Sequence, residues 1–282
     1  MSRSVLPTVR RGRGPALMLL HGFAGSAGTL ADVAGAFEQE YETIVPDLPG
    51  HGRSATVASA AGYGFDACLD DLVATLESTG HARAHWLGYS MGARLALGCA
   101  LRHPGSVASL VLVGGRAGIA DRGAREERRR ADEALADRIE SLGVEAFLDE
   151  WLAQPLFDTR RCLEPGVLAR DRRARLGNDA RGLAASLRSL GPGAQPPLFD
   201  ALSRVTVPVL LVAGALDIRF VELAHDLARR LPLAEVREIP GAGHAAHLER
   251  PEAFIRVARD HLRRTAGAAS SDLSNPLQEF TS

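Results

Sequence analysis

The sequence predicts an α/β protein built on a mostly parallel, doubly wound sheet, and two observations support this prediction. Short apolar runs recur along the chain, and each one is stopped by glycine or proline. Stretches with helical periodicity separate these runs. Near-continuous apolar runs suit strands covered on both faces, as in a parallel sheet. Strands that alternate with helices are typical of a doubly wound fold.

The individual elements follow from these patterns. The predicted strands are the apolar runs Ala16–Leu20, Thr43–Val45, His85–Leu87, Leu110–Val113 and Val209–Val212, followed by the mixed run Ala234–Ile239. The predicted helices are the periodic stretches Phe65–Thr79, Met91–His103, Val221–Leu231 and Pro251–Arg264.

One long segment, residues 116–204, contains no strand-like run and is rich in arginine. It is too long for an ordinary connection between a strand and a helix. We therefore predict a core of residues 1–115 and 205–264, with 116–204 as a helical cap insertion over the sheet. The Ala/Ser-rich end, 265–282, lacks periodicity and is predicted to be disordered.

The composition excludes several classes of function. The 282 residues carry 33 Lys+Arg and 34 Asp+Glu, a formal net charge of -1. This balance removes the electrostatic argument for a nucleic-acid or acidic-membrane partner. Every basic residue is arginine, which excludes Schiff-base enzymes and P-loop phosphate binders because both need a lysine amine.

Cysteine usage and hydropathy indicate a cytoplasmic protein. Cys68, Cys99 and Cys162 are widely spaced and form no Cys-x-x-Cys pair. The N-terminus has no apolar core of a signal peptide, and no stretch approaches the ~20 apolar residues of a membrane span. We expect a monomer or small homo-oligomer.

A catalytic serine is predicted at the end of the third predicted strand. Gly88-Tyr89-Ser90-Met91-Gly92 fits the pattern G-x-S-x-G, with a strand before it and a helix after it. The glycines allow a strained turn that lifts the serine hydroxyl clear of the sheet. A chance Gly/Ser-rich turn is the weaker alternative, because both flanking elements are in place.

A serine hydroxyl becomes a useful nucleophile or base only beside an imidazole that a carboxylate orients. In this arrangement the chain order is serine, acid, histidine, each after a later strand. Asp217 and His244 follow the last two predicted strands in that order. Asp217 could instead cap the next helix, and His247 is the rival to His244. We predict a triad of Ser90, Asp217 and His244.

Backbone amides near this serine are predicted to form an oxyanion hole. Phe23 lies in His21-Gly22-Phe23-Ala24-Gly25 after the first predicted strand, and Met91 follows the serine. Their N–H groups would bind a developing oxyanion. His21 is expected to be a buried hydrogen-bonding residue. A metal site formed by His21, His51, His244 and His247 is disfavoured, because no pair has helical ligand spacing.

Two arginines fall among apolar residues. Arg94 lies four residues after Ser90 in an otherwise apolar helix, and therefore on the same face. In the insertion, Arg128 projects within about 20° of Leu135 and Ile139, at the centre of an apolar stripe. A buried guanidinium pairs with a protein carboxylate, extends its charge to solvent or binds an anion. The residue pattern alone leaves these alternatives open. The arginines expected to be solvated or ion-paired are Arg125, Arg129 and Arg130.

Together these motifs resemble the α/β-hydrolase superfamily. The segments that carry the resemblance are His21–Gly25, Asp47–Ser54, Gly88–Gly92, Asp217 and Gly241–His247. They cover nearly all of the chain outside the insertion and the tail. The resemblance implies an α/β-hydrolase fold with a helical cap, but no particular chemistry, since the fold hosts many.

Further motifs resemble one branch, the menaquinone-pathway 2-succinyl-6-hydroxy-2,4-cyclohexadiene-1-carboxylate synthases. These motifs are Gly88–Arg94, Gly114-Gly115 with Gly118-Ile119, Glu126–Asp132, Trp151–Phe157, Gly182–Leu187 and Gly191–Pro196. By motif, the substrate-binding residues of the branch map onto Arg94, Arg128, Arg175, Trp151 and Tyr89. Arg170, Arg172 and Arg173 compete with Arg175 in this mapping. The chain departs from the branch at Arg219, where lysine is frequent, and in its tail.

The resemblance implies a lyase that eliminates pyruvate from 2-succinyl-5-enolpyruvyl-6-hydroxy-3-cyclohexene-1-carboxylate. Ser90, polarised by His244 and Asp217, would remove an acidic proton, and the oxyanion-hole amides would stabilise the enolate-like oxygen. Arginine forks would hold the carboxylates. The implied partner is this small polycarboxylate, with no metal and no organic cofactor.

Two other functions remain open at this point. A carboxylesterase or C–C bond hydrolase would use the same triad, but an esterase of neutral substrates would have no use for inward arginines. A non-catalytic ligand receptor could keep the fold, but it would not need a complete triad.

Overall fold

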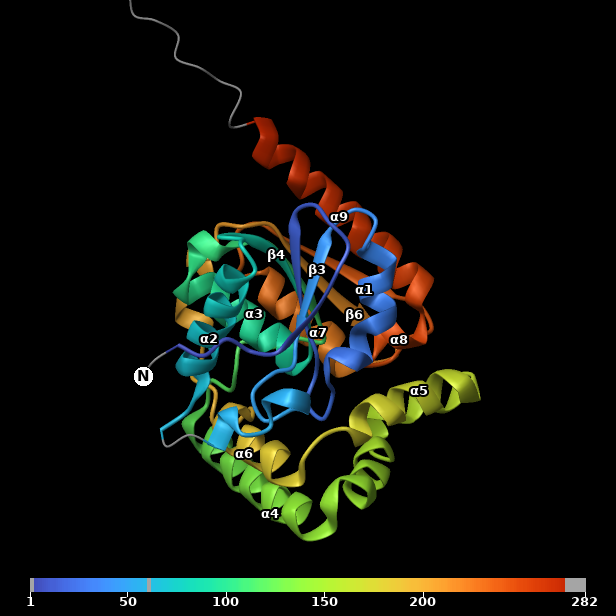
Figure 1. Cartoon of the computed structure of the whole chain (residues 1–282). Coiled ribbons are helices and arrows are strands. Elements are labelled where there is room, and N and C mark those ends of the chain that lie inside the picture. Colours follow the sequence, from blue (N-terminus) through green and yellow to red (C-terminus); the bar gives the residue numbers. More distant parts are fainter. Residues whose placement is uncertain (1–2, 60–61, 272–282) are drawn as a thin grey trace, which may run out of the picture.

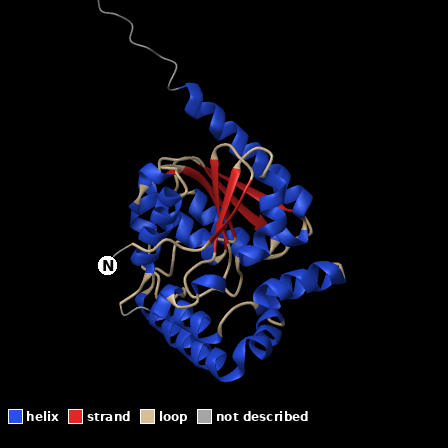
Figure 2. Cartoon of the chain, in the orientation of Figure 1, coloured by secondary structure: helices blue, strands red, loops and turns tan. Residues whose placement is uncertain are grey.

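Within the part of the chain that the structure describes, seven strands form one central sheet with helices on both faces (Figures 1 and 2). The computed structural model describes residues 3–59 and 62–271. The strand order is β1-β3-β2-β4-β5-β6-β7. All neighbours from β3 to β7 are parallel, and only β1 pairs in the antiparallel direction. The strands are β1 (Thr8–Arg11), β2 (Ala16–Leu20), β3 (Glu42–Pro46), β4 (Ala84–Tyr89), β5 (Val107–Val113), β6 (Val209–Gly214) and β7 (Ala234–Ile239). The predicted mostly parallel, doubly wound sheet is confirmed.

The central strands are covered on both sides, which explains their continuous apolar sequences. Every residue of β2, β4 and β6 is buried. Strand β1 was not predicted, because its sequence Thr-Val-Arg-Arg contains no apolar run. It lies at the sheet edge, where half-exposed polar residues are tolerated.

Two groups of helices cover the two faces of the sheet. Leu30, Val33 and Phe37 pack with Phe254 and Leu262 on one face. Helices α2, α3 and α7 cover the other face (Figure 1). The core helices are α1 (Ala31–Phe37), α2 (Phe65–Ser78), α3 (Met91–Arg102), α7 (Ile218–Ala228), α8 (Ala246–Glu249) and α9 (Pro251–Ser271). The short 3-10 helices of the core are η1 (Ala27–Leu30), η2 (Gly52–Ser54), η3 (Val57–Ser59) and η4 (Pro104–Ser106). Within the described residues, no helix combines the length and the apolarity that a membrane span needs.

The last helix differs from the sequence prediction, which ended the core at 264 and began a disordered tail at 265. Helix α9 instead continues to Ser271. Ion pairs from Arg259 and Arg263 to Glu40 hold it against the end of α1, and alanine-rich sequence favours continued helix. The rest of the predicted tail, 272–282, lies outside the described residues.

The insertion is helical and contains no strand among its described residues. Its elements are α4 (Arg122–Leu152), η5 (Pro155–Cys162), α5 (Pro165–Leu176), α6 (Ala180–Leu190) and η6 (Phe199–Arg204). We call α4, η5, α5 and α6 the cap; it lies below the sheet in Figure 1. Helix α4 is kinked at Gly143, whose φ is 73°.

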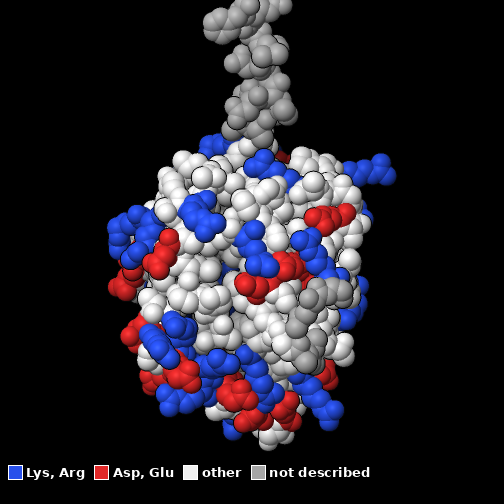
Figure 3. Space-filling view, turned by 90° about the vertical axis from the view of Figure 1, so that its left-hand side faces the viewer, with Lys and Arg blue, Asp and Glu red and all other residues white. Residues whose placement is uncertain are grey.

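Apolar packing and ion pairs hold the cap together. Ile139 and Phe147 of α4 pack with Leu183 and Leu187 of α6. Outside this cluster, Arg188 of α6 bonds to three acidic side chains of α4, Glu133, Asp137 and Glu140. Charges of both signs likewise lie side by side on the molecular face drawn in Figure 3.

The turn between β4 and α3 depends on two glycines. A Cβ atom at Gly88 would lie 2.3 Å from the carbonyl oxygen of Gly92, and one at Gly92 would lie 2.2 Å from that of Leu20. Both contacts are with backbone, which cannot move aside as a side chain can. The turn therefore packs directly against β2.

We predict that Gly92→Ala destabilises the protein by about 1–3 kcal/mol, the cost of overpacking a tight site. Gly35→Ala is the matched control, because Gly35 lies inside α1 and a Cβ atom there would meet no atom within 4 Å. That control should gain about 0.5–1 kcal/mol, since alanine is the better helix former. Urea unfolding measures both, and equal stability of Gly92→Ala and wild type would contradict the close packing of the turn.

Candidate active site

Ser90 stands on a strained turn at the end of β4. Its φ of 52° and ψ of -104° are unusual for a residue with a side chain. The Ser90 amide donates a hydrogen bond of 2.8 Å to the carbonyl of Val113 on β5. The turn thereby joins two central strands and presents the hydroxyl at the carboxyl end of the sheet.

Ser90, His244 and Asp217 form one hydrogen-bonded chain. His244 Nε2 lies 3.2 Å from Ser90 Oγ, and His244 Nδ1 lies 2.8 Å from Asp217 Oδ2. A proton on Nδ1, held by the carboxylate, leaves Nε2 free to accept the serine proton. Although Asp217 is the N-cap residue of α7, its side chain makes no capping hydrogen bond. The Asp217 carboxylate therefore bonds to the His244 imidazole and does not cap the helix.

Aromatic rings fix the His244 imidazole. Its centroid lies 4.4 Å from that of Phe220 and 5.4 Å from that of Tyr89. Gly114, with φ of 59°, passes so close that a Cβ there would lie 2.8 Å from His244 Cε1. His244 is 3% exposed, so the ring has little freedom to leave the chain of hydrogen bonds.

The other histidines have structural surroundings. The ring of His247 lies 4.4 Å from that of Tyr89, and burial lowers the pKa of His247 to about 3. His21 Nε2 accepts a hydrogen bond from the Leu48 amide at 3.0 Å, and burial lowers the pKa of His21 to about 4. His51 Nε2 accepts from the Ala24 amide at 3.1 Å. Two neutral imidazoles thus hold the loops around Phe23.

Phe23 and Met91, the predicted oxyanion-hole residues, both line a cavity beside Ser90. Met91 is the first residue of α3, and the first amides of a helix have no carbonyl partner within it. Ala24, the residue after Phe23, has φ of 57°. This unusual conformation shapes the loop next to the serine.

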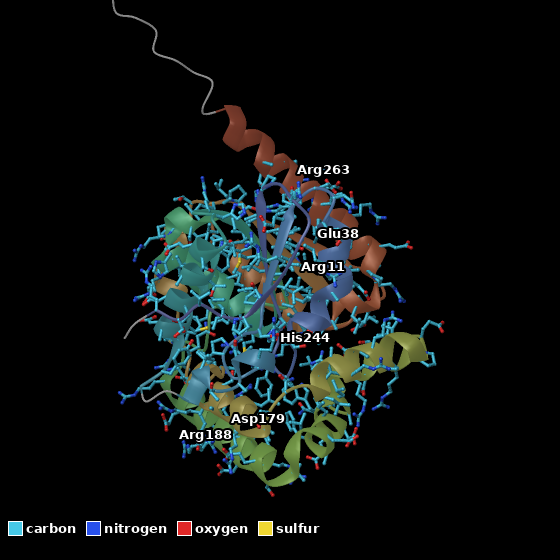
Figure 4. The ribbon with its side chains drawn as sticks, viewed as in Figure 1. Arg11, Glu38, Asp179, Arg188, His244 and Arg263 are labelled. Carbon is cyan, nitrogen blue, oxygen red and sulfur yellow. The ribbon has the colours of Figure 1, made fainter. Side chains whose placement is uncertain are left out.

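The cavity has a volume of about 440 Å³ and lies between the carboxyl ends of the strands and the cap. Figure 4 shows His244 at this end of the sheet, facing the part of the molecule that carries Asp179 and Arg188. The predicted site residues that line it are Ser90, His244, Phe23, Met91, Tyr89, Arg94, Arg128, Trp151 and Arg175. Asp217 lies outside the lining, bonded to His244.

Arg94 is buried and bonds only to neutral groups. It donates to Gln195 Oε1 at 2.8 Å and to the Leu190 carbonyl at 2.9 Å, and the residue is 5% exposed. Burial, followed by the nearby charges of Arg116 and Arg128, lowers the pKa of Arg94 to about 9. Among the described residues no carboxylate bonds to this guanidinium.

The two cap arginines are each oriented by a buried aspartate. Arg128 Nε donates to Asp132 Oδ1 at 2.7 Å, and Asp132 also accepts from the Gly193 amide. Arg175 Nε donates to Asp171 Oδ2 at 2.8 Å. Of the four arginines between 170 and 175, only Arg175 is buried. In both pairs the terminal guanidinium nitrogens remain for other partners.

Two further arginines, Arg116 and Arg219, line this cavity beside the three predicted ones. Sequence reasoning missed Arg116 and noted Arg219 only as a departure from the branch. Burial, then the charges of Arg219 and Arg128, lower the pKa of Arg116. Both residues follow the ends of central strands, where ligands of α/β sheets bind, and this position could have identified them. Asp132 is the one carboxylate among the described residues that line the cavity.

Aromatic side chains form the apolar side of the cavity. The ring of Trp151 lies 5.4 Å from that of Phe23 and 5.8 Å from that of Phe157. Trp151 Nε1 is buried without a hydrogen-bond partner in the described structure. A buried donor of this kind is available to a ligand oxygen.

Comparisons with known proteins identify the family of this chain. The model of the α/β-hydrolase fold family matches residues 15–251. A 2-succinyl-6-hydroxy-2,4-cyclohexadiene-1-carboxylate synthase of Escherichia coli O1:K1 is 34% identical over 254 residues, covering 88% of this chain and 94% of the relative. The enzyme of that name from Enterobacter sp. strain 638 is 35% identical over 249 residues, covering 88% and 92%.

Two solved structures are similar over most of their length. MenH from S. aureus superposes with a TM-score of 0.87 and 29% identity, covering 92% of this chain and 98% of the other. A thermophilic esterase from Thermogutta terrifontis has a TM-score of 0.79 and 28% identity, covering 92% and 93%. The resemblance predicted from the sequence is confirmed, and the chain belongs to the α/β-hydrolase fold family.

Proposed function

We propose that the protein is a carbon–oxygen lyase of menaquinone biosynthesis. It eliminates pyruvate from 2-succinyl-5-enolpyruvyl-6-hydroxy-3-cyclohexene-1-carboxylate and forms 2-succinyl-6-hydroxy-2,4-cyclohexadiene-1-carboxylate. Relatives at 34% and 35% identity are named for making this product. The observation that carries the proposal is Arg94, a buried cation with neutral partners, one helical turn from Ser90. A substrate with several carboxylates supplies the missing negative charge.

The reaction begins with removal of the proton on the ring carbon next to the succinyl carbonyl. His244 Nε2 takes the hydroxyl proton of Ser90, and Ser90 Oγ takes the carbon-bound proton. Asp217 stabilises the imidazolium that results. The distances of 3.2 Å from Ser90 Oγ to His244 Nε2 and 2.8 Å from His244 Nδ1 to Asp217 Oδ2 lie within hydrogen-bond reach, which supports direct proton transfer.

The negative charge then passes to the succinyl carbonyl oxygen. The amides of Phe23 and Met91 donate hydrogen bonds to this oxygen, which lowers the energy of the enolate. As the enolate collapses, the ring gains its second double bond and the C–O bond to the enolpyruvyl group breaks. The leaving group is the enolate of pyruvate. It takes up the proton held by His244 and becomes pyruvate, so the triad ends in its starting state.

The arginines hold the carboxylates while the proton moves. Bidentate guanidinium–carboxylate contacts fix both position and orientation, and the aromatic wall formed by Phe23, Trp151 and Phe157 covers the ring. A fixed substrate carbon close to Ser90 Oγ lowers the barrier through orientation alone.

A carboxylesterase is the second candidate, because an esterase is among the similar solved structures and the same triad can act as a nucleophile. Neutral esters would leave Arg94 without a counter-charge. The lyase therefore accounts for more of the cavity.

We predict that Ser90→Ala and His244→Ala each lower kcat by about three orders of magnitude or more, because they act as one proton-transfer unit. Asp217→Asn should lower kcat less than either, since the acid mainly orients the histidine. Steady-state pyruvate release from the pathway intermediate measures this. A Ser90→Ala protein with near-normal kcat would show that the triad is not the base.

Arg128 and its neighbour Arg129 test the role of the cavity arginines. Arg94→Ala, Arg128→Ala and Arg175→Ala should each lower kcat/KM by the equivalent of about 1.5–3 kcal/mol, the range for a hydrogen bond to a charged group. Arg129→Ala is the control, because Arg129 is exposed and does not line the cavity. Equal losses at Arg128 and Arg129 would contradict an orientation-specific contact.

Lyase and hydrolase differ in their intermediates. A lyase should release pyruvate without a burst and yield no Ser90 adduct in rapid-quench mass spectrometry, whereas slow deacylation of a hydrolase would produce both a burst and an adduct. Hydrolysis of p-nitrophenyl acetate should be feeble, since this ester engages none of the arginines. Ester turnover faster than pyruvate release would favour the esterase.

A further inference from the structure

Arg160 on η5 is a buried cation, and two of its three guanidinium nitrogens have no hydrogen-bond partner in the described structure. It is 5% exposed, and its Nη2 bonds to Asp171 Oδ2. Its Nε and Nη1 have no partner in the described structure. Buried guanidinium groups normally satisfy their donors, and each unmet donor costs stability.

Asp171 is shared between two arginines. The same oxygen, Oδ2, also accepts from Arg175 Nε at 2.8 Å. Burial would raise the pKa of Asp171, but the charges of Arg175 and Arg160 outweigh it and lower that pKa. One carboxylate therefore faces two cations, and the cluster carries net positive charge.

The aromatic side chains around this cluster do not balance the charge. Tyr89 and Phe157 are uncharged, and His247 stays neutral because burial lowers its pKa to about 3. The buried acid Glu249 accepts hydrogen bonds from the amides of Gly243 and Ala245, and within the described residues it bonds to neither arginine of the cluster. The open side of the cluster is the cavity, which Arg175 lines.

On the cavity side, the terminal nitrogens of Arg175 are hydrogen-bond donors without a protein partner in the described structure. Within the part of the chain that the structure describes, its hydrogen bond is the one from Nε to Asp171, so Nη1 and Nη2 are unused. If Asp171 paired with Arg175 alone, the carboxylate would balance the charge of that guanidinium. Arg160 bonds to the same oxygen, so one negative charge is shared between two positive ones.

We propose that Arg160 is a positioning residue: by sharing Asp171 it leaves the charge of Arg175 only partly balanced and the terminal nitrogens of Arg175 free to bind a carboxylate of the ligand. This inference rests on the proposed function in taking the ligand to be a polycarboxylate. It gives a role to a charge that the pairing of Asp171 does not require, because Asp171 would still be paired with Arg175 if Arg160 were replaced, and no buried charge would be left without a partner.

The test uses Arg160→Met with Arg161→Met as its matched control. Arg161 is the next residue, but its side chain is 71% exposed and pairs with Asp158. The probe is 2-succinylbenzoate, a stable aromatic dicarboxylate with the ring carboxylate and succinyl chain of the proposed product. Calorimetry gives its Kd, and thermal unfolding without probe gives Tm.

We expect Arg160→Met to weaken probe binding about tenfold, at the lower end of the range for a charge-assisted contact, and Arg161→Met to change it less than twofold. The Tm of Arg160→Met should equal or exceed that of wild type. In an Arg175→Met background, Arg160→Met should cause no further loss, because its effect passes through Arg175. Arg160→Lys, which keeps the charge, should retain most of the affinity.

A structural role would give the opposite pattern. Unchanged probe affinity in Arg160→Met, or an equal loss with and without Arg175, would overturn the inference. If Arg160→Met does not fold, Arg160→Gln replaces it, because glutamine can still bond to Asp171 without a charge; wild-type affinity in that variant would overturn the inference equally. Probe binding that depends on Arg160, in a protein that releases no pyruvate, would overturn the proposed function but not this inference.

Discussion

Positive charge around Ser90 is the constraint on which the rest of the site depends. Five arginines line the cavity, and Asp132 is the one carboxylate among the described lining residues. Arg94 shows the imbalance most directly, since it is buried with a side-chain amide and a backbone carbonyl as its partners. Charge of one sign in a low-dielectric cleft is costly unless a counter-charge enters. The cavity is therefore matched to an anion.

The core and the cap both contribute side chains to the lining of this cavity. The core contributes the triad, the amides and Arg94, all at the ends of parallel strands. The cap contributes Arg128, Arg175, Trp151 and Phe157, and the last two complete the aromatic wall with Phe23 of the core. Two buried aspartates aim the cap arginines, and His51 holds the loop that carries Phe23. Because the fold hosts many chemistries, we propose that the cap and its charges select the substrate.

The sequence was sufficient to predict the sheet, the triad and the inward positions of Arg94 and Arg128, because each depends on local pattern and chain order, whereas Arg175 was identified only through the resemblance to the branch. Ser90 and Asp217 follow strands with clear apolar runs, and His244 follows β7, an edge strand in which apolar and charged residues are mixed. The partners of Arg94 could not be predicted, since Gln195 and Leu190 lie about a hundred residues further along the chain. The burial of Arg160 depends on how η5 packs against α5, and nothing distinguishes it from Arg161 in the sequence. Strand β1 escaped prediction because an edge strand needs no apolar run.

The central claim is that unbalanced charge selects a polycarboxylate ligand, and it can be tested on the wild-type protein. The direct measurement compares the affinity for 2-succinylbenzoate with that for its dimethyl ester, which has a similar shape but no charge. The charge imbalance predicts that the diacid binds at least about tenfold more tightly, and that added salt narrows the difference. Equal affinities, or tighter binding of the ester, would contradict the account.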